Sequence, residues 1–183
     1  MDQRVGYYAG ITVNYRGLLE ARVLHYDNRA DLAAEAPKIA DDAWLTYFDS
    51  LGLRWTPSEG WTLISQWLHG RTFIDAYQPT NAWSFDSEFL LASWKRGAMR
   101  YSARYDRFAS QQTASNFLQY VNGIYFGDRG HAWTLACNRQ FDQHWSASLE
   151  AIEAPSWVAQ RALINEPTSA TERQVQLALR YER

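Results

Sequence analysis

The chain has little cysteine and no long apolar run. Cys137 is the only cysteine among 183 residues, so no disulfide can form within the chain and a cysteine-based metal site would need other ligands. No stretch of about 18 consecutive apolar residues occurs, which excludes a transmembrane helix. A transmembrane β-strand remains allowed, because only every second side chain of such a strand faces lipid. The net charge of −2 gives no electrostatic case for binding nucleic acid.

Motifs that carry chemistry are also missing. The four histidines have no ligand spacing, which predicts no metal site; they are His25, His69, His131 and His144. We find no recognisable pairing of a serine with a histidine, and no glycine-rich loop placed to hold a phosphate. We therefore expect no catalytic residues, no cofactor and no enzymatic activity.

Aromatic residues, in contrast, are abundant. The chain holds nine Trp, eleven Tyr and eight Phe. Trp and Tyr combine an apolar body with a polar tip, so they suit a protein core, a binding surface or a membrane interface. Their positions along the chain must decide among these three.

Nine stretches of about ten to fourteen residues have the character of β-strands. Lengths near ten fit strands that cross a membrane at a tilt, which need ~9–11 residues. The stretches are Val5–Tyr15, Leu18–Asn28, Ala43–Trp55, Trp61–Phe73, Trp83–Lys95, Ala98–Phe108, His131–Phe141, Trp145–Ala154 and Glu172–Arg183.

Apolar and polar residues alternate within these stretches. In Trp83–Lys95, Trp83 and Phe89 share one face, while Asp86 and Glu88 share the other. The same alternation recurs in Ala98–Phe108, Trp145–Ala154 and Glu172–Arg183. Period-two alternation predicts a sheet with one apolar and one polar face.

The connections alternate in length. The short ones are Arg16-Gly17, Thr56–Gly60, Arg96-Gly97 and Asp142–His144. The long ones are Arg29–Asp42, Ile74–Ala82, Ala109–Gly130 and Pro155–Thr171. Strict alternation of this kind is typical of outer-membrane barrels, which have short periplasmic turns and long external loops.

Aromatic residues are expected at both ends of the strands. Those at the short-turn end are Tyr15, Trp55, Trp61, Trp94, Phe141, Trp145 and Tyr181. Those toward the long-loop end are Tyr7, Tyr26, Trp44, Phe73, Trp83, Tyr105 and Trp133. Two such rings are the arrangement expected at the two interfaces of a bilayer.

Three segments depart from the simple pattern. Asp49 falls on the face of Leu51 and Leu53, and we expect a β-bulge near Asp49-Ser50 to remove it from that face. Gly123–Phe126 resembles a short extra strand within a long loop. Arg29–Asp42 is expected to hold a short helix or a mobile loop.

The sequence thus predicts an all-β, antiparallel up-and-down meander of about nine strands. We expect a single domain over residues 1–183, forming a transmembrane β-barrel or the C-terminal part of one. Single-chain bacterial barrels normally have an even number of strands. The odd count, the absence of a signal peptide and a strand beginning almost at Met1 lead us to expect a longer parent with further N-terminal strands.

Four segments carry a resemblance to a known family. They are Phe89–Gly97, Tyr101–Phe108, Gly130–Ala136 and Ala170–Tyr181. The chain resembles Gram-negative outer-membrane porin-like proteins, including those grouped with phosphate-selective porins. The resemblance is to a pattern of strands, and it implies a barrel in the bacterial outer membrane, in contact with lipid and with small hydrophilic solutes. One departure is that the chain ends in Tyr181-Glu182-Arg183 rather than in an aromatic residue.

If the apolar faces point to lipid, the polar faces line a lumen. The candidate lumen residues are Glu20, Arg22, Arg54, Asp86, Glu88, Arg100, Arg104, Asp106, Asn138, Glu150 and Arg180. Their arginines could attract anions, as rings of Arg and Lys do in phosphate pores. The competing interpretation is that acids and bases on neighbouring strands pair and fill the interior.

We therefore expect a channel component for passive diffusion of small hydrophilic solutes, with an anion preference where the arginines are unpaired. Two alternatives stay open. One is a soluble barrel that binds a small apolar ligand inside. The other is a plugged barrel that serves as an anchor or adhesin. Alternation alone does not distinguish inside from outside, and the sequence leaves open a homo-oligomer.

Overall fold

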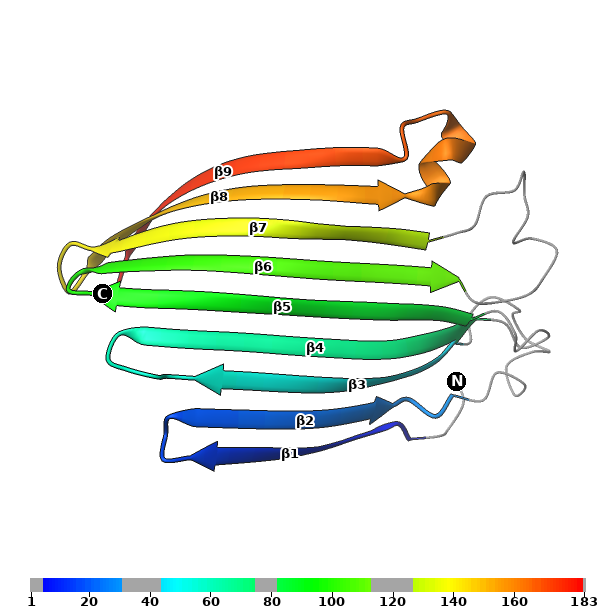
Figure 1. The fold of residues 1–183 in the computed structure, drawn as a ribbon, viewed down its shortest axis with the longest axis horizontal. Coiled ribbons are helices and arrows are strands. Elements are labelled where there is room, and N and C mark those ends of the chain that lie inside the picture. Colours follow the sequence, from blue (N-terminus) through cyan, green and yellow to red (C-terminus); the bar gives the residue numbers. More distant parts are fainter. Residues whose placement is uncertain (1–4, 31–43, 75–81, 113–126, 183) are drawn as a thin grey trace.

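The chain forms nine antiparallel strands in one sheet, in the order β1 to β9 (Figure 1). The computed structural model describes residues 5–30, 44–74, 82–112 and 127–182. Each strand pairs with the next one along the chain, so the sheet is an up-and-down meander, as the sequence predicts. The strands are β1 (Tyr7–Tyr15), β2 (Leu19–Asp27), β3 (Trp44–Trp55), β4 (Trp61–Ile74), β5 (Ala82–Arg96), β6 (Met99–Gln112), β7 (Gly127–Gln140), β8 (Trp145–Val158) and β9 (Ser169–Tyr181).

All the short turns lie at one end of the sheet, and the longer connections lie at the other (Figure 1). The first hairpin turns at Arg16 and Gly17, whose φ angles are 53° and 68°. Positive φ at both central residues is the mark of a type I′ turn, whose twist matches that of the flanking strands. The predicted alternation of short and long connections is therefore confirmed.

The strands β6 to β9 are longer than expected on the long-loop side, whereas β1 to β3 are one or two residues shorter there. β6 continues to Gln112, β7 begins at Gly127 and β8 continues to Val158. The connection from β8 to β9, expected to be a loop, contains a 3₁₀ helix, η2 (Ala159–Ile164). The predictions for Gly123–Phe126 and for a helix within 29–42 fall on segments that lie outside the described residues, apart from Arg29 and Ala30.

The bulge expected near Asp49 is wrong. Asp49 pairs in unbroken register with His25 on β2 and with His69 on β4. Its carboxylate Oδ1 lies 2.7 Å from Nδ1 of His25. A polar partner on the neighbouring strand therefore accommodates the aspartate, and the ladder continues without an inserted residue.

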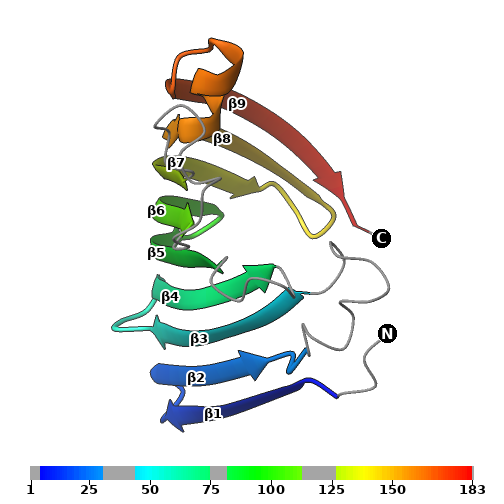
Figure 2. The same ribbon diagram turned by 90° about the vertical axis from the view of Figure 1, so that its right-hand side faces the viewer.

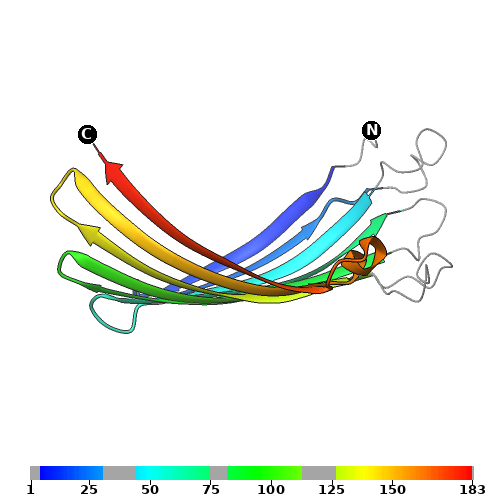
Figure 3. The same cartoon turned by 90° about the horizontal axis from the view of Figure 1, so that it is seen from above.

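The sheet is strongly curved and is not closed (Figures 2 and 3). The long β-strands bend into an open trough, with β1 and β9 at its two edges. A barrel wall has this kind of curvature, but the described residues do not complete the circle. A closed barrel therefore stays a prediction.

The sheet has no hydrophobic core. Among the described residues, the only buried apolar side chains are Ala82 and Ala159, which are 5% and 2% exposed. Large apolar side chains are instead exposed, for example Leu177 at 80% and Leu135 at 60%. A single layer of strands has nothing on either face to pack against, so these side chains need a partner that is not part of the described chain.

Candidate functional site

The register of the strands sorts the side chains onto two faces, since directly paired residues point to the same side of a sheet. We call the first the apolar face. One row crosses it from edge to edge and consists of Tyr15, Leu19, Trp55, Leu63, Ala92, Ala103, Leu135, Ala151 and Val175.

We call the opposite side the polar face. A row there consists of Asn14, Glu20, Arg54, Ile64, Leu91, Arg104, Thr134, Ile152 and Gln174. The two rows contrast on most strands, but on β4, β5 and β8 the polar-face row also holds an apolar residue: Ile64, Leu91 and Ile152. This contrast agrees with the two-faced sheet that the sequence predicts.

Exposure indicates that the polar face is the concave one. Side chains converge on the inside of a curved sheet and diverge on the outside. The buried Ser50 and Ser93 lie on the polar face, whereas Leu90, Leu135 and Leu149, on inner strands of the apolar face, are 55%, 60% and 51% exposed. The apolar face is therefore the convex outside of the trough.

Nine of the eleven candidate lumen residues lie together on the polar face: Glu20, Arg22, Arg54, Arg100, Arg104, Asp106, Asn138, Glu150 and Arg180. Placing Asp86 and Glu88 with them is wrong. These two acids pair with Ala109 and Arg107 and lie on the apolar face. Phe89, expected to face outward, lies on the polar face opposite Asp106.

Arg104 is held in place by two neighbours on the polar face. Its Nε donates to both carboxylate oxygens of Asp106, at 2.9 and 2.8 Å. Its Cζ lies 4.2 Å from the ring centroid of Phe89, within cation–π distance. The charge of Arg104 is therefore largely balanced within the sheet.

Three other arginines on this face have no acidic partner among the described residues: Arg22, Arg54 and Arg100. Nη1 of Arg100 donates to Oγ of Ser93 at 3.0 Å. Arg22 and Arg54 border a hollow of about 280 Å³, together with Gly52 and Glu20. Glycine at position 52 leaves space between the two arginine side chains. Glu20 lies directly opposite Arg54 in the register, so the hollow holds two basic groups and one acidic group.

The apolar face carries charged groups toward both ends of the strands: Arg96 and Arg139 lie near the short turns, and the others lie toward the long-loop end. Two similar pairs lie there in one row: His25 with Asp49 and His69 with Asp86, each with an Nδ1–Oδ1 distance of 2.7 Å. Arg107 donates to Glu88 at 3.1 Å. No group of three or more metal-ligating side chains occurs in the part of the chain that the structure describes. These pairs are half-exposed and are consistent with a solvated surface.

The aromatics of the short-turn end form a coherent row. Tyr15, Trp55, Trp61, Trp94, Trp145 and Tyr181 all lie on the apolar face, and Phe141 lies in the turn after β7. Trp61 stacks on Trp94 with 5.9 Å between ring centroids, and Trp94 stacks on Tyr101 at 6.0 Å. These contacts join three rings near the turns, and a separate contact joins Trp145 to Tyr181 at 4.9 Å.

The aromatics of the long-loop end do not form a matching ring. Tyr7, Phe73, Tyr105 and Trp133 lie on the apolar face, but Tyr26, Trp44 and Trp83 lie on the polar face. Tyr26 stacks there on Phe48 at 5.0 Å. The expected second ring is therefore wrong for these three residues, because closeness to a strand end does not determine which face a side chain occupies.

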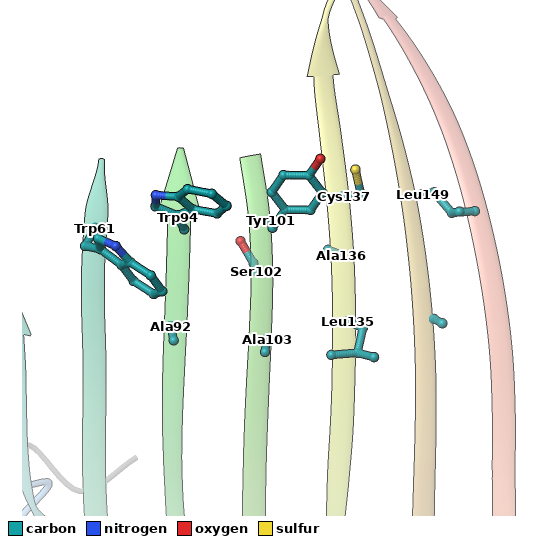
Figure 4. Close-up of a pocket in the computed structure, with 11 residues that line it drawn as sticks. Trp61, Ala92, Trp94, Tyr101, Ser102, Ala103, Leu135, Ala136, Cys137 and Leu149 are labelled. Carbon is teal, nitrogen blue, oxygen red and sulfur yellow. The ribbon is translucent and has the colours of Figure 1, made fainter. Parts of the chain in front are cut away.

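A shallow groove crosses the apolar face from β4 to β8 (Figure 4). Its volume is about 530 Å³. Trp61, Trp94 and Tyr101 border its short-turn end, and the small side chains of Ala92 and Ala103 form its floor. The sequence analysis did not identify the groove, because it arises where small residues of neighbouring strands come into register.

Three arginines near the short turns were also missed. The Cζ atoms of Arg16, Arg96 and Arg139 lie 5.2, 5.8 and 5.2 Å from the ring centroids of Tyr15, Trp94 and Phe141. None of the three has an acidic partner among the described residues. The signal in the sequence was an arginine within two positions of an aromatic at a strand end.

Comparison with models of protein families, with curated proteins and with solved structures gives no match for this chain. Within the described residues, no helix is long and apolar enough to cross a membrane. The arrangement of the two faces therefore carries the functional argument.

Proposed function

We propose that the chain forms part of the wall of a porin-like channel in a bacterial outer membrane. Its apolar face contacts lipid, and its polar face lines an aqueous path for small hydrophilic solutes. The solutes diffuse passively, and the protein contributes charge and shape rather than bond chemistry.

The single observation that carries this proposal is the exposure of apolar side chains on the convex face of a sheet without a core. A protein in water buries large apolar side chains, and contiguous exposed apolar patches mark an interaction with another apolar phase. Leu135, Leu149 and Leu177 are more than half exposed on that face. Lipid is the partner that would cover such a surface on every strand.

The height of the apolar face supports the same conclusion. On β5 this face is apolar between Glu88 and Arg96, and on β7 it is apolar between His131 and Arg139. Eight residues at ~3.3 Å each correspond to about 26 Å along a strand. A strand tilt of ~35–45° reduces this to about 20 Å, close to the ~25 Å apolar band of outer-membrane barrels.

The polar face supports an anion preference. Arg22, Arg54 and Arg100 lie on it without an acidic partner among the described residues, whereas Arg104 is paired with Asp106. Basic side chains lining a pore attract anions and repel cations. The preference is expected to be moderate, because Glu20, Glu150 and Asp106 lie on the same face.

The two open edges of the sheet must be paired with further strands before the sheet can line a channel. The outer edges of β1 and β9 pair with no strand among the described residues. Unpaired backbone groups are costly in hydrocarbon, so a working wall must close through further strands. Those strands belong either to the same polypeptide or to other copies of this chain.

The soluble-barrel alternative needs the apolar face inside. The exposure pattern places that face on the convex side, which argues against an apolar ligand within the trough. The anchor or adhesin alternative keeps the lipid-facing wall, and it differs from the channel only in having a blocked lumen.

Ion conductance and labelling together test the proposal. The full chain is reconstituted in lipid vesicles and in planar bilayers. Thr134 on the polar face and Leu135 on the apolar face are neighbours on β7, which makes them a matched pair. In a Cys137→Ala background, the Thr134→Cys variant should react with a membrane-impermeant maleimide, and the Leu135→Cys variant should not.

Discrete conductance steps with a chloride-weighted reversal potential are the expected electrical result. Equal labelling of the two variants, or a monodisperse protein in water without detergent, would contradict the lipid-facing wall. Protection of Leu135→Cys without any conductance would support the anchor instead.

A further inference from the structure

We propose that the groove on the apolar face is a binding site for one anionic glycerophospholipid, with the phosphate between Arg96 and Arg139 and an acyl chain along the groove. The inference rests on the proposed function, because it needs the apolar face to contact a bilayer. It goes further by assigning a lipid class and a position to the contact.

The two arginines lie in the row next to the groove. Arg96 pairs with Met99, and Met99 pairs with Arg139, so all three share the apolar face. Strands are ~4.8 Å apart, which places the two arginine backbones about 10 Å from each other. Long side chains on either side of Met99 can therefore reach a single phosphate.

Both guanidinium groups are oriented but unneutralised. The Cζ atoms of Arg96 and Arg139 lie 5.8 and 5.2 Å from the ring centroids of Trp94 and Phe141, within cation–π distance. A cation–π contact does not use the N–H donors of a guanidinium in hydrogen bonds. Because neither arginine has a carboxylate partner among the described residues, an anion from outside the sheet is the complementary group. Arginine binds phosphate oxygens through paired hydrogen bonds.

The groove continues from this row toward the middle of the apolar face. The next row holds Trp94, Tyr101 and Cys137, and the row after it holds Ala92 and Ala103 (Figure 4). The order from strand end to strand middle is thus cation, aromatic and then small apolar side chains. A phospholipid has the same order of anionic headgroup, interfacial glycerol region and hydrocarbon tail. The order of groups along a phospholipid therefore matches the order of side chains along the groove.

A plain lipid contact would not have these features together. The hydrocarbon wall elsewhere on the apolar face is rough with large side chains such as Trp67 and Leu53. Among the described residues, the β4–β8 region is the one that combines a hollow on the apolar face with two arginines that have no acidic partner at its end. The occupant is therefore distinguished by its charge as well as by its apolar chain.

Native mass spectrometry of the full chain from mixed micelles tests the site, with phosphatidylglycerol and phosphatidylcholine of identical acyl chains as probes. The wild-type chain should retain phosphatidylglycerol several-fold more than phosphatidylcholine. The Arg96→Gln/Arg139→Gln variant should lose this preference. Arg16→Gln is the matched control, since Arg16 is also within cation–π distance of an aromatic ring at the short-turn end but lies in the β1–β2 hairpin, away from the groove.

A second variant tests the tail. Ala103→Phe fills the groove and leaves both arginines in place, so it should lower phosphatidylglycerol retention as much as the arginine pair does. If Ala103→Phe instead changes the oligomeric state and leaves lipid retention unchanged, the groove seats another copy of the chain and the lipid site is overturned. An equal loss of preference in Arg16→Gln would also overturn it, because net charge alone would then explain the selectivity.

The two proposals fail in different ways. Equal labelling of Thr134→Cys and Leu135→Cys in vesicles contradicts the membrane wall itself. Protection of Leu135→Cys together with no preference between the two lipids leaves the wall intact and removes only the phospholipid site.

Discussion

Arg104 lies over the ring of Phe89, with its Cζ 4.2 Å from the ring centroid, and this contact places a large aromatic among the charged residues of the polar face. Phe89 and Leu91 make β5 locally apolar on the concave side, while Asp86 and Glu88 make it locally charged on the convex side. Pairing with the neighbouring strands thus determines which side chains of β5 point to the concave side and which to the convex side.

Removing Asp106 should increase the anion preference of a reconstituted channel. Asp106→Asn leaves the Arg104 guanidinium without its carboxylate, so the net charge of the polar face rises by one. The reversal potential measured in a KCl gradient should move toward the equilibrium potential of chloride. Glu88→Gln is the control, because Glu88 also pairs with an arginine, Arg107, but on the apolar face. An equal shift in both variants would contradict the assignment of the two faces.

Gly70 should tolerate no side chain. A Cβ added there would lie 2.5 Å from Cζ of Phe85 and 2.6 Å from Cβ of Phe48. Gly70→Ala should therefore cost about 1–3 kcal/mol of unfolding free energy through overpacking, measured by denaturant titration in detergent. Gly52, on the same face in the neighbouring strand, has its nearest atom 3.9 Å away, so Gly52→Ala should be neutral or slightly stabilising. A Gly70→Ala variant as stable as wild type would show that the concave side is less crowded than described.

Trp94 should stabilise the chain through the aromatic row. Its ring lies between those of Trp61 and Tyr101, at 5.9 and 6.0 Å. Trp94→Leu removes both stacking contacts and keeps an apolar side chain, so we expect a loss of about 1–3 kcal/mol, at ~0.5–1.5 kcal/mol for each aromatic pair. The measurement is the denaturant midpoint for unfolding from vesicles. Leu90→Ala, also on the apolar face of β5 but outside the row, is a control for lost apolar area alone.

Cys137 offers a probe that needs no mutation. Its side chain is half-buried and borders the groove on the apolar face. In vesicles it should react with a lipid-soluble maleimide and resist a membrane-impermeant one. In detergent, added phosphatidylglycerol should slow its reaction more than phosphatidylcholine does. Rapid labelling of intact vesicles by the impermeant reagent would place Cys137 in water and contradict the lipid-facing wall.

Much of the fold follows from the sequence alone, because strand period, turn residues and connection length are local signals. Alternation, stretch length and turn residues together predicted nine strands. Arg16-Gly17 was predicted correctly as a turn, and the turn expected at Arg96-Gly97 lies one residue later, at Gly97-Ala98. Nine of the eleven candidate lumen residues share the polar face for the same reason: on most strands one face is clearly the more apolar.

The predictions that were wrong concern features that depend on residues from other strands. β5 has apolar residues on both faces, and only its register with β4 and β6 decides that Leu90 and Trp94 belong with the apolar side. Asp49 was expected to need a bulge because its partner His25, on another strand, was not visible as a partner in the sequence. The groove and its two arginines were missed because they come from separate strands.

The strands continue well beyond the apolar part of the convex face. β5 begins at Ala82 and β6 ends at Gln112, and the register between them is unbroken from Trp83 to Arg96. In a membrane, this excess would stand above the hydrocarbon as a hydrogen-bonded rim. If the proposed channel forms, this paired rim gives its mouth on that side a width set by the hydrogen-bonded strands.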